Sequence, residues 1–152
     1  MKLNRIVVAT DFSDVSLRAL ETAFSLALES DATVYLVHVL ESLARVDPFL
    51  GWVSPSLAEP YEEVMDRLAT LIPENRHRDV TIERVVETGI PAKTIADLAR
   101  KKGADMIVVG THGRTGIARM LMGSTAESLL REAPCQVLVV KPHATVKIAQ
   151  CV

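Results

Sequence analysis

The sequence predicts a single α/β domain built on an open parallel sheet with helices on both faces, as in Rossmann-like folds. Short apolar runs alternate along the chain with longer segments of helical period. The first run, Arg5–Thr10 (RIVVAT), is apolar without alternation, as expected of a strand buried on both faces. A chain of 152 residues is long enough for one such core. Because each helix must return the chain over the sheet, we expect five strands paired in parallel through right-handed crossovers.

The first helix is predicted from Val15 to about Ser30. Ser13 or Asp14 can cap its start, because both side chains accept hydrogen bonds from free backbone N–H groups. Apolar residues recur at helical spacing and define a buried face made of Leu17, Leu20, Phe24, Ala27 and Leu28. The second strand is expected at Thr33–Val39.

A long loop and a second helix are predicted in the middle of the chain. Residues 40–55 show no periodicity and contain Pro48, Gly51 and Pro55. The following S-x-x-E pattern, from Ser56 to Glu59, matches a capping box. We therefore expect a helix to begin there and to end near Pro73.

The second half of the chain continues the alternation of strands and helices. Pro91 suits the first turn of a helix and Gly103 suits its end. The predicted elements are a strand at Val80–Val86, a helix at Pro91–Lys102, a strand at Ala104–Val109, a helix at Thr125–Arg131 and a strand at Gln136–Val140.

The stretch from Met106 to Glu127 carries the strongest functional signal. A strand ends at Gly110, a loop with further glycines at positions 113, 116 and 123 follows, and Ser124 to Glu127 forms an S-x-x-E pattern that predicts a helix start capped by Ser124. Glycines let a backbone approach an anion, and a helix N-terminus offers free N–H groups and a positive dipole end. The stretch therefore predicts a phosphate site, although it matches neither G-x-x-x-x-G-K-[ST] nor G-x-G-x-x-G.

The spacing of this loop is G-x2-G-x9-G-[ST], carried by Gly110, Gly113, Gly123 and Ser124. It resembles the ATP-binding branch of the universal stress protein family. The resemblance extends from Lys2 to about Pro142 and includes the segments VVATDFSDVS, VHV and APCQVLVVKP. It implies a sheet of strand order 3-2-1-4-5, a domain over residues 1–142 and a short tail over residues 143–152.

The resemblance also implies a ligand, ATP with ADP or AMP as alternatives, together with Mg²⁺. By matching position, Asp11 contacts the nucleoside or the metal, with Ala9 and Thr10 beside it, and the main chain of Val39 contacts adenine. The positions that match the phosphate and ribose contacts are Gly110, Thr111, Gly113, Arg114, Gly123, Ser124 and Thr125.

The predicted topology and the glycine motif indicate the same ligand position. Ligands of open α/β sheets bind at the carboxyl ends of the strands, where the strand order reverses. In the order 3-2-1-4-5 that point lies between the first and fourth strands, which are followed by Asp11 and Gly110.

Several of these residues also have a purely structural interpretation. The glycines can relieve a tight loop, and Asp11 can be a helix-start acid without a ligand. His112 is better read as a loop residue than as a catalyst, and His38 as a core histidine satisfied by a neighbour. Arg114 and Arg119 can offset triphosphate charge, and Arg119 serves a surface role equally well.

Composition excludes several classes of protein. The net charge of −2 gives no general attraction to nucleic acid or to anionic membranes. The apolar runs are too short to span a bilayer. Cys135 and Cys151 show neither metal-ligand spacing nor a disulfide framework, so we expect a cytoplasmic protein with reduced thiols.

The sequence favours nucleotide binding over efficient catalysis, because no residue that would orient an attacking water is identifiable. We expect an ATP-binding stress-response regulator, a sensor or signalling protein; the alternatives are a nucleotide-free interaction module and a weak ATPase. A phosphoacceptor receiver domain is excluded because the third strand ends VVETG, without an acceptor Asp. The apolar last strand, Gln136–Val140, lies at a sheet edge in this order and predicts a homodimer.

Overall fold

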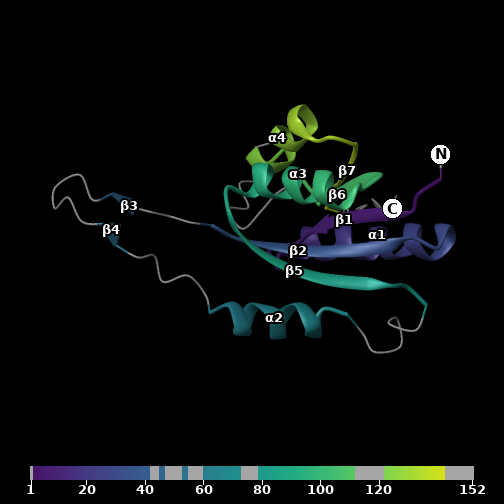
Figure 1. The fold of residues 1–152 in the computed structure, drawn as a ribbon, viewed down its shortest axis with the longest axis horizontal. Helices are drawn as coiled ribbons and strands as arrows, with labels where there is room; N and C mark the ends of the chain where they lie inside the picture. The colour runs from purple at the N-terminus through teal and green to yellow at the C-terminus, as the bar shows by residue number, and fades with distance from the viewer. Residues whose placement is uncertain are drawn as a thin grey trace, which may run out of the picture.

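The computed structural model describes residues 2–41, 45–46, 53–54, 60–72, 79–111 and 122–142. Its centre is a five-stranded parallel sheet of order β5-β2-β1-β6-β7 (Figure 1). The strands are β1 (Arg5–Ala9), β2 (Thr33–Glu41), β5 (Ile82–Gly89), β6 (Met106–Gly110) and β7 (Gln136–Val140). In the order of the five predicted strands this is 3-2-1-4-5, so the predicted topology is confirmed.

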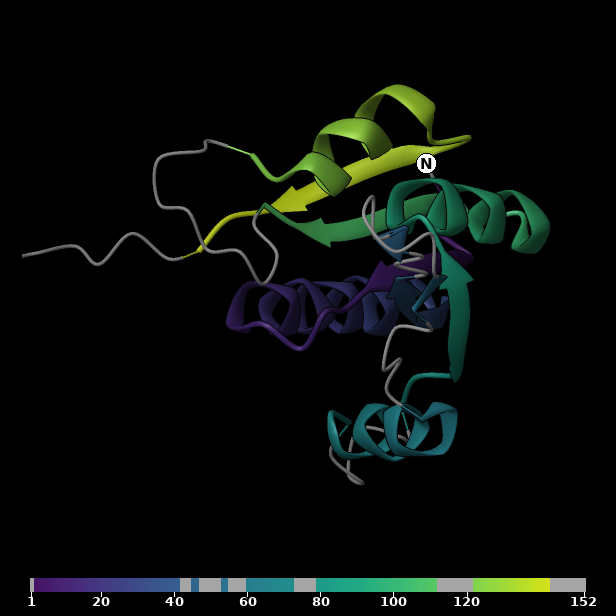
Figure 2. The ribbon, with the colours of Figure 1, turned by 90° about the vertical axis from the view of Figure 1, so that its left-hand side faces the viewer.

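Four helices cover the two faces of the sheet among the described residues: α1 (Asp14–Ser30) and α2 (Tyr61–Thr70) on one face, α3 (Pro91–Lys102) and α4 (Ser124–Glu132) on the other. In Figure 2, α3 and α4 lie to the upper right of the sheet and α1 and α2 to its lower left. Each face buries its own apolar cluster, and the central strands β1, β2 and β6 contribute to both. Burial on both faces explains the continuous apolar runs of the sequence.

Helix α1 begins at Asp14, one residue before the predicted Val15, and its buried face also differs from the prediction. Ser13 is the N-cap, and its side chain accepts a hydrogen bond from the backbone N–H of Ser16. Leu28 was expected on the buried face and is 61% exposed. The face against the sheet uses mainly small residues, which let the helix lie close to the strands; it consists of Ser16, Ala19, Leu20, Ala23, Phe24 and Ala27.

The middle of the chain departs most from the predicted elements. Helix α2 begins at Tyr61, after Pro60, and its N-cap makes no side-chain hydrogen bond. The predicted capping box from Ser56 to Glu59 lies outside the described residues. Two short antiparallel strands, β3 (Arg45–Val46) and β4 (Val53–Ser54), lie within the stretch expected to be a loop.

The boundaries of β5 and β6 shift for reasons visible in their neighbours. Strand β5 pairs with β2 from Ile82 to Gly89, so the third strand begins and ends later than predicted. Strand β6 begins at Met106 rather than Ala104, because the N–H of Ala104 bonds the carbonyl of Ala99 and closes the end of α3. Helix α3 itself agrees with the prediction, since it runs from Pro91 to Lys102 and Gly103 ends it with a φ of 60°.

Asp105 ties the beginnings of the two central strands together. Its carboxylate accepts hydrogen bonds from the backbone N–H groups of Asn4 at 2.7 Å and Arg5 at 2.9 Å. These two bonds hold the pKa of Asp105 below its ordinary value. The starts of β1 and β6, and with them their register, are thereby fixed.

Candidate functional site

The candidate site lies where β1, β2 and β6 end. Val8 pairs with Leu36 on one side and with Val108 on the other, so the carboxyl ends of the three strands lie side by side. The N–H of Thr10 bonds the carbonyl of Val37 at 2.9 Å and extends this alignment past the end of β1. Ala9 and Val39 both pack on the face covered by α3 and α4.

Asp11, directly after β1, has its carboxylate held by Ser13. Its Oδ1 accepts hydrogen bonds from the Ser13 hydroxyl at 2.5 Å and from the Ser13 N–H at 3.0 Å. Burial of the carboxyl works to raise its pKa, but the hydrogen bonds to the carboxylate, of which those from Ser13 are the strongest, together outweigh burial and hold the pKa of Asp11 below its ordinary value. Asp11 is therefore ionised at neutral pH. Because it bonds Ser13, the N-cap of α1, it also supports the start of that helix, which agrees with the alternative interpretation of Asp11 as a helix-start acid.

Thr10 is buried on the opposite face from Ala9 and organises the turn after β1. Its hydroxyl lies 3.0 Å from the hydroxyl of Ser16 and accepts from the N–H of Phe12 at 3.1 Å. Its carbonyl oxygen lies 2.8 Å from Nδ1 of His38. Since a carbonyl can only accept, this contact places the proton on Nδ1. His38 is buried, as predicted for a core histidine satisfied by a neighbour.

Phe12 adopts a backbone conformation that a bulky residue rarely takes. Its φ is 65°, in the left-handed region, which costs roughly 1–3 kcal/mol when the surroundings impose it. Its ring lies against the His38 ring, with centroids 4.7 Å apart, and the guanidinium carbon of Arg67 lies 3.8 Å from the Phe12 ring centroid. The residue next to Asp11 is thus held by contacts from β2 and α2.

Gly110, the last residue of β6, has a packing role of its own. A Cβ at this position would lie 2.8 Å from Cγ1 of Val15 and 3.3 Å from the backbone N of Ser16. The glycine therefore lets the end of β6 approach the first turn of α1. This need is independent of any phosphate.

Thr111 closes the base of the glycine loop. It is 1% exposed, its N–H bonds the carbonyl of Val140 at 2.8 Å, and its carbonyl accepts the N–H of Gly123. The two ends of the loop are thereby brought together beside β7. The predicted residues between these ends lie outside the described residues: His112, Gly113, Arg114, Gly116 and Arg119.

The start of α4 corrects one prediction. Gly123 is the N-cap and its carbonyl accepts the N–H of Glu127 at 3.0 Å, so Ser124 is the first helical residue and not the cap. The capping box predicted from Ser124 to Glu127 is therefore wrong, because the helix begins one residue earlier than the pattern implies. The φ of Gly123 is −75°, a value open to any residue. The first N–H groups of a helix have no partner within the helix, so those of Ser124 and Thr125 are the ones that an anion at the start of α4 would use.

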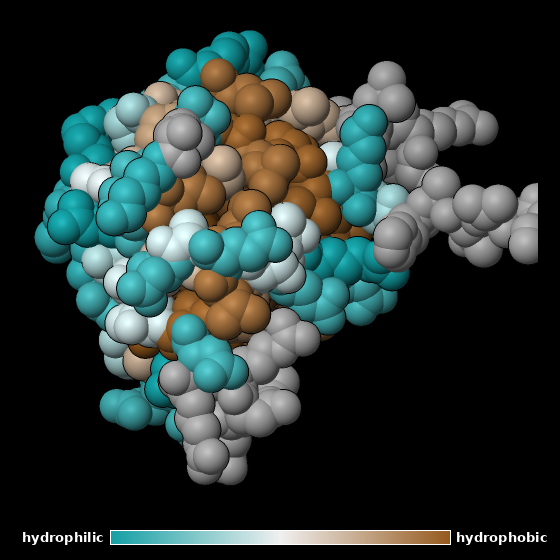
Figure 3. Space-filling model, turned by 90° about the vertical axis from the view of Figure 1, so that its right-hand side faces the viewer, coloured by the Kyte–Doolittle hydropathy of each residue, from teal (hydrophilic) through white to brown (hydrophobic). Residues whose placement is uncertain are grey.

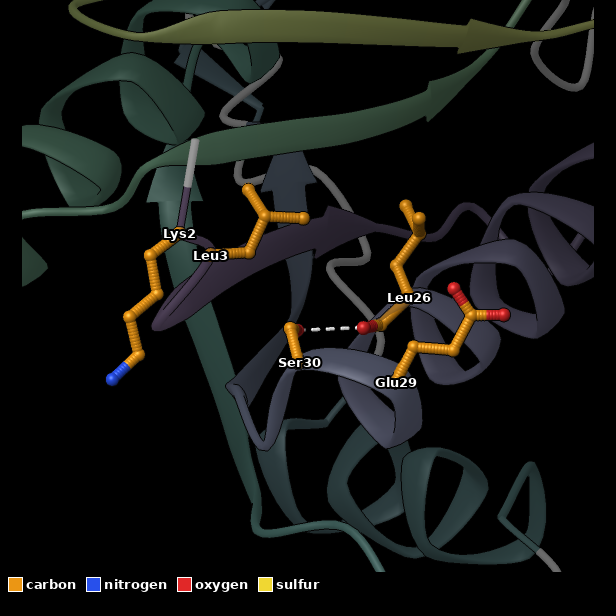
Figure 4. A pocket seen from close by; sticks show the side chains of 5 residues that line it. All are labelled: Lys2, Leu3, Leu26, Glu29 and Ser30. Carbon is orange, nitrogen blue, oxygen red and sulfur yellow. Dashed lines mark hydrogen bonds between the residues drawn. The ribbon is translucent and has the colours of Figure 1, made fainter.

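Two other features of the described residues bear on ligand binding. No group of three or more His, Cys, Asp or Glu side chains among them could hold a metal ion. A shallow pocket lies at the other end of β1, between the residues before that strand and the last turns of α1 (Figure 4). Its lining residues are Lys2, Leu3, Leu26, Glu29 and Ser30, and the Ser30 hydroxyl donates to the carbonyl of Leu26 at 2.6 Å.

Comparison with known proteins identifies the family. Residues 2–141 match the family described as Universal stress protein family. The chain belongs to the universal stress protein family. It is 41% identical over 145 residues to the universal stress protein MJ0531 of Methanocaldococcus jannaschii, covering 90% of this chain and 81% of that protein.

Solved structures of universal stress proteins share the fold. The structure of protein MJ0577 is 26% identical, has a TM-score of 0.79 and covers 95% of this chain and 100% of that one. A universal stress protein from Archaeoglobus fulgidus in complex with dAMP is 26% identical, with a TM-score of 0.67 and coverage of 93% and 100%. A universal stress protein in complex with cAMP has the same identity and TM-score, with coverage of 92% and 98%.

Three residues that shape this site, Phe12, Ser13 and Arg67, were not predicted as part of it. Ser13 and Phe12 follow Asp11 directly, and Arg67 comes from α2, far away along the chain. Ser13 was expected only as a helix cap. The strain at Phe12 and its contact with Arg67 leave no mark in the sequence, because they depend on how α2 packs.

Proposed function

We propose that this universal stress protein binds an adenine nucleotide, ATP in the first place, at the carboxyl ends of β1, β2 and β6. The observation that carries the proposal is the convergence of an ionised Asp11, the backbone turn at Gly110 and Thr111, and the N-terminus of α4 at one sheet edge. The carboxyl ends of β1 and β6 form the topological switch point of the sheet, which is the usual ligand position in open α/β sheets. The family members in complex with dAMP and cAMP support the same ligand class.

Each end of the nucleotide would find a suitable partner. The phosphates would accept hydrogen bonds from the glycine loop, with Gly113 and Arg114, and from the first turn of α4 at Ser124 and Thr125. The main chain of Val39 would contact adenine, with Ala9 and Thr10 beside it.

Asp11 would contact the ribose or a magnesium ion shared with the phosphates. A carboxylate ionised at neutral pH suits both uses, and Mg²⁺ commonly takes only one or two protein carboxylates besides phosphate oxygens. When bound, Mg²⁺ would neutralise phosphate charge. The chain's own contribution is to hold the carboxylate in place through Ser13.

The arrangement favours holding a nucleotide over hydrolysing it. Hydrolysis requires a group that orients water toward the terminal phosphate. Among the described residues, His38 contacts the turn after β1, but it is buried and its Nδ1 bonds the carbonyl of Thr10. We therefore infer a nucleotide-dependent sensor or signalling protein in the stress response, with cytoplasmic location and slow hydrolysis as secondary expectations. In this view residues 1–142 form the nucleotide-binding domain.

The sheet edge at β7 fits a homodimer. Strand β7 pairs with β6 on one side and carries no charged residue, whereas the opposite edge, β5, carries Glu83, Arg84 and Glu87. Charges protect an edge from pairing, so β7 is the edge open to a second copy. Figure 3 shows apolar side chains gathered on the face opposite to that in Figure 2.

The nucleotide proposal is tested by ligand binding. Native mass spectrometry of the purified protein would reveal a co-purified nucleotide, and titration with a fluorescent ATP analogue would give its affinity. We expect Asp11→Ala to weaken binding at least about tenfold, while the matched variant Asp14→Ala, three residues along in the first turn of α1, binds like the parent protein. Equal binding by both variants, with native circular dichroism, would assign Asp11 to the helix start alone.

The same titration separates the alternatives. A nucleotide-free interaction module would bind no analogue in any variant. A weak ATPase would release phosphate from ATP well above the rate of the Asp11→Ala protein.

A further inference from the structure

Helix α2 contacts the turn that presents Asp11 through a stacked pair of side chains. The guanidinium of Arg67 lies over the ring of Phe12, 3.8 Å from its centroid, and Phe12 is the residue after Asp11. A guanidinium at this distance from an aromatic face makes a favourable cation–π contact. The ring of His38 from β2 also contacts Phe12, with ring centroids 4.7 Å apart.

The turn needs such support, because Phe12 has a positive φ. A phenylalanine at a φ of 65° leaves that conformation when its surroundings release it, whereas glycine adopts it without strain. The bond from the Phe12 N–H to the Thr10 hydroxyl fixes one end of the turn. The stack on Arg67 holds the side chain at the other end.

Helix α2 is itself modestly held. It has ten residues, its N-cap makes no side-chain hydrogen bond, and its fully buried side chains are Val64 and Leu68. Isolated helices of this length are marginal in water, so α2 depends on its packing against β5 and β2. Figure 2 shows α2 at the periphery of the molecule.

We propose that Arg67 is a positioning residue for Asp11, and that docking of α2 and binding of the adenine nucleotide are therefore coupled. This inference rests on the proposed function. With α2 docked, Arg67 holds Phe12 in its strained turn, and the neighbouring Asp11 keeps the carboxylate position in which Ser13 bonds it. With α2 released, the turn relaxes and the nucleotide loses this contact. By linkage, the nucleotide strengthens α2 docking by the same factor by which docking strengthens nucleotide binding.

A double-mutant cycle tests the coupling. Arg67→Ala should weaken binding of the fluorescent ATP analogue about fivefold. Phe12→Gly should keep near-parental affinity, because glycine adopts the turn without a clamp. In the Phe12→Gly background, Arg67→Ala should then cost no further affinity. The control Arg100→Ala removes an exposed arginine of α3 that pairs with Asp97, and should leave binding unchanged.

Amide hydrogen exchange, measured with and without nucleotide on the parent protein and on Phe12→Gly, gives a second, independent readout. The nucleotide should slow exchange of the α2 amides, residues 61–70, and this slowing should vanish in Phe12→Gly. A merely structural role of Arg67 would weaken binding equally in both backgrounds, and that result would overturn the coupling.

The outcomes separate the two proposals. If the parent protein and Arg67→Ala bind the analogue with equal affinity, the coupling is overturned and the nucleotide site stands. Absence of nucleotide binding by the parent protein would overturn the proposed function, and the coupling with it.

Discussion

Gly110 and Val15 lie so close that no side chain fits between them. A Cβ on Gly110 would meet Cγ1 of Val15 at 2.8 Å and its carbonyl carbon at 3.2 Å. The first glycine of the nucleotide motif is thus also the point where β6 rests on the start of α1. Packing constrains this position, and the proposed nucleotide site would constrain it as well, so a variant there should report on both.

Gly110→Ala should therefore destabilise the fold by about 1–3 kcal/mol, as overpacking does. Part of the strain comes from a flexible side chain, so Val15→Ala should recover some of this loss in the double variant. Urea unfolding of the two single variants and the double variant measures the coupling. An equal cost of Gly110→Ala in both backgrounds would show that Val15 is not the obstacle.

Asp105 should contribute stability that depends on pH. Because its folded-state pKa is lowered by the N–H groups of Asn4 and Arg5, its contribution is present above the ordinary carboxyl pKa of about 4 and is lost as the pH falls through the lowered value. Asp105→Asn should be less stable than the parent at pH 7, and its stability should fall less between about pH 5 and pH 2. Urea midpoints across this range check the slope.

Asp97→Asn is the matched control for this experiment. The Lys93 ammonium, bonded to the Asp97 carboxylate, and Arg100 hold the pKa of Asp97 below its ordinary value, but these partners are exposed charges. High salt should erase the effect of Asp97→Asn and leave that of Asp105→Asn largely intact, because Asp105 bonds to backbone N–H groups. Equal salt sensitivity of the two variants would contradict the role assigned to Asp105.

Ser124 should matter for the ligand and little for stability, because Gly123 takes the cap. We expect Ser124→Ala to change the free energy of unfolding by less than about 0.5 kcal/mol. Ser124→Asp should stabilise α4 slightly through the helix dipole and repel the phosphates. A large stability loss in Ser124→Ala would show that Ser124 caps the helix after all. Unchanged ATP affinity in Ser124→Asp would show that Ser124 does not contact the nucleotide.

The fold was predictable because its signals are local. Continuous apolar runs mark strands buried on both faces, and Pro91 and Gly103 mark the two ends of α3. The pattern misplaced Leu28, since a helix lying close to the sheet buries alanines in place of the larger residues that periodicity favours. It also misread the start of α4, because a glycine N-cap gives no side-chain signal.

The geometry of the candidate site was predictable only in its outline. The ends of β1 and β6 follow from topology, and Asp11 and Gly110 from their place after those strands. The contact of Arg67 with Phe12 joins α2 to the β1 end and could not be read from spacing. A positive φ at a phenylalanine is a tertiary effect, so no local rule anticipates it.

The last prediction concerns the edge of the sheet at β7. Pairing of this strand with its copy about a two-fold axis would satisfy its outward N–H and C=O groups and close the assembly. Leu138→Lys places a charge in that edge and Val139→Pro removes a donor, so each should yield monomer or insoluble protein. Thr88→Lys, on the β5 edge, is the matched control and should leave the dimer intact. Light scattering at micromolar concentration measures the mass. A monomeric parent protein, or a dimer unaffected by both β7 substitutions, would rule out pairing through this strand.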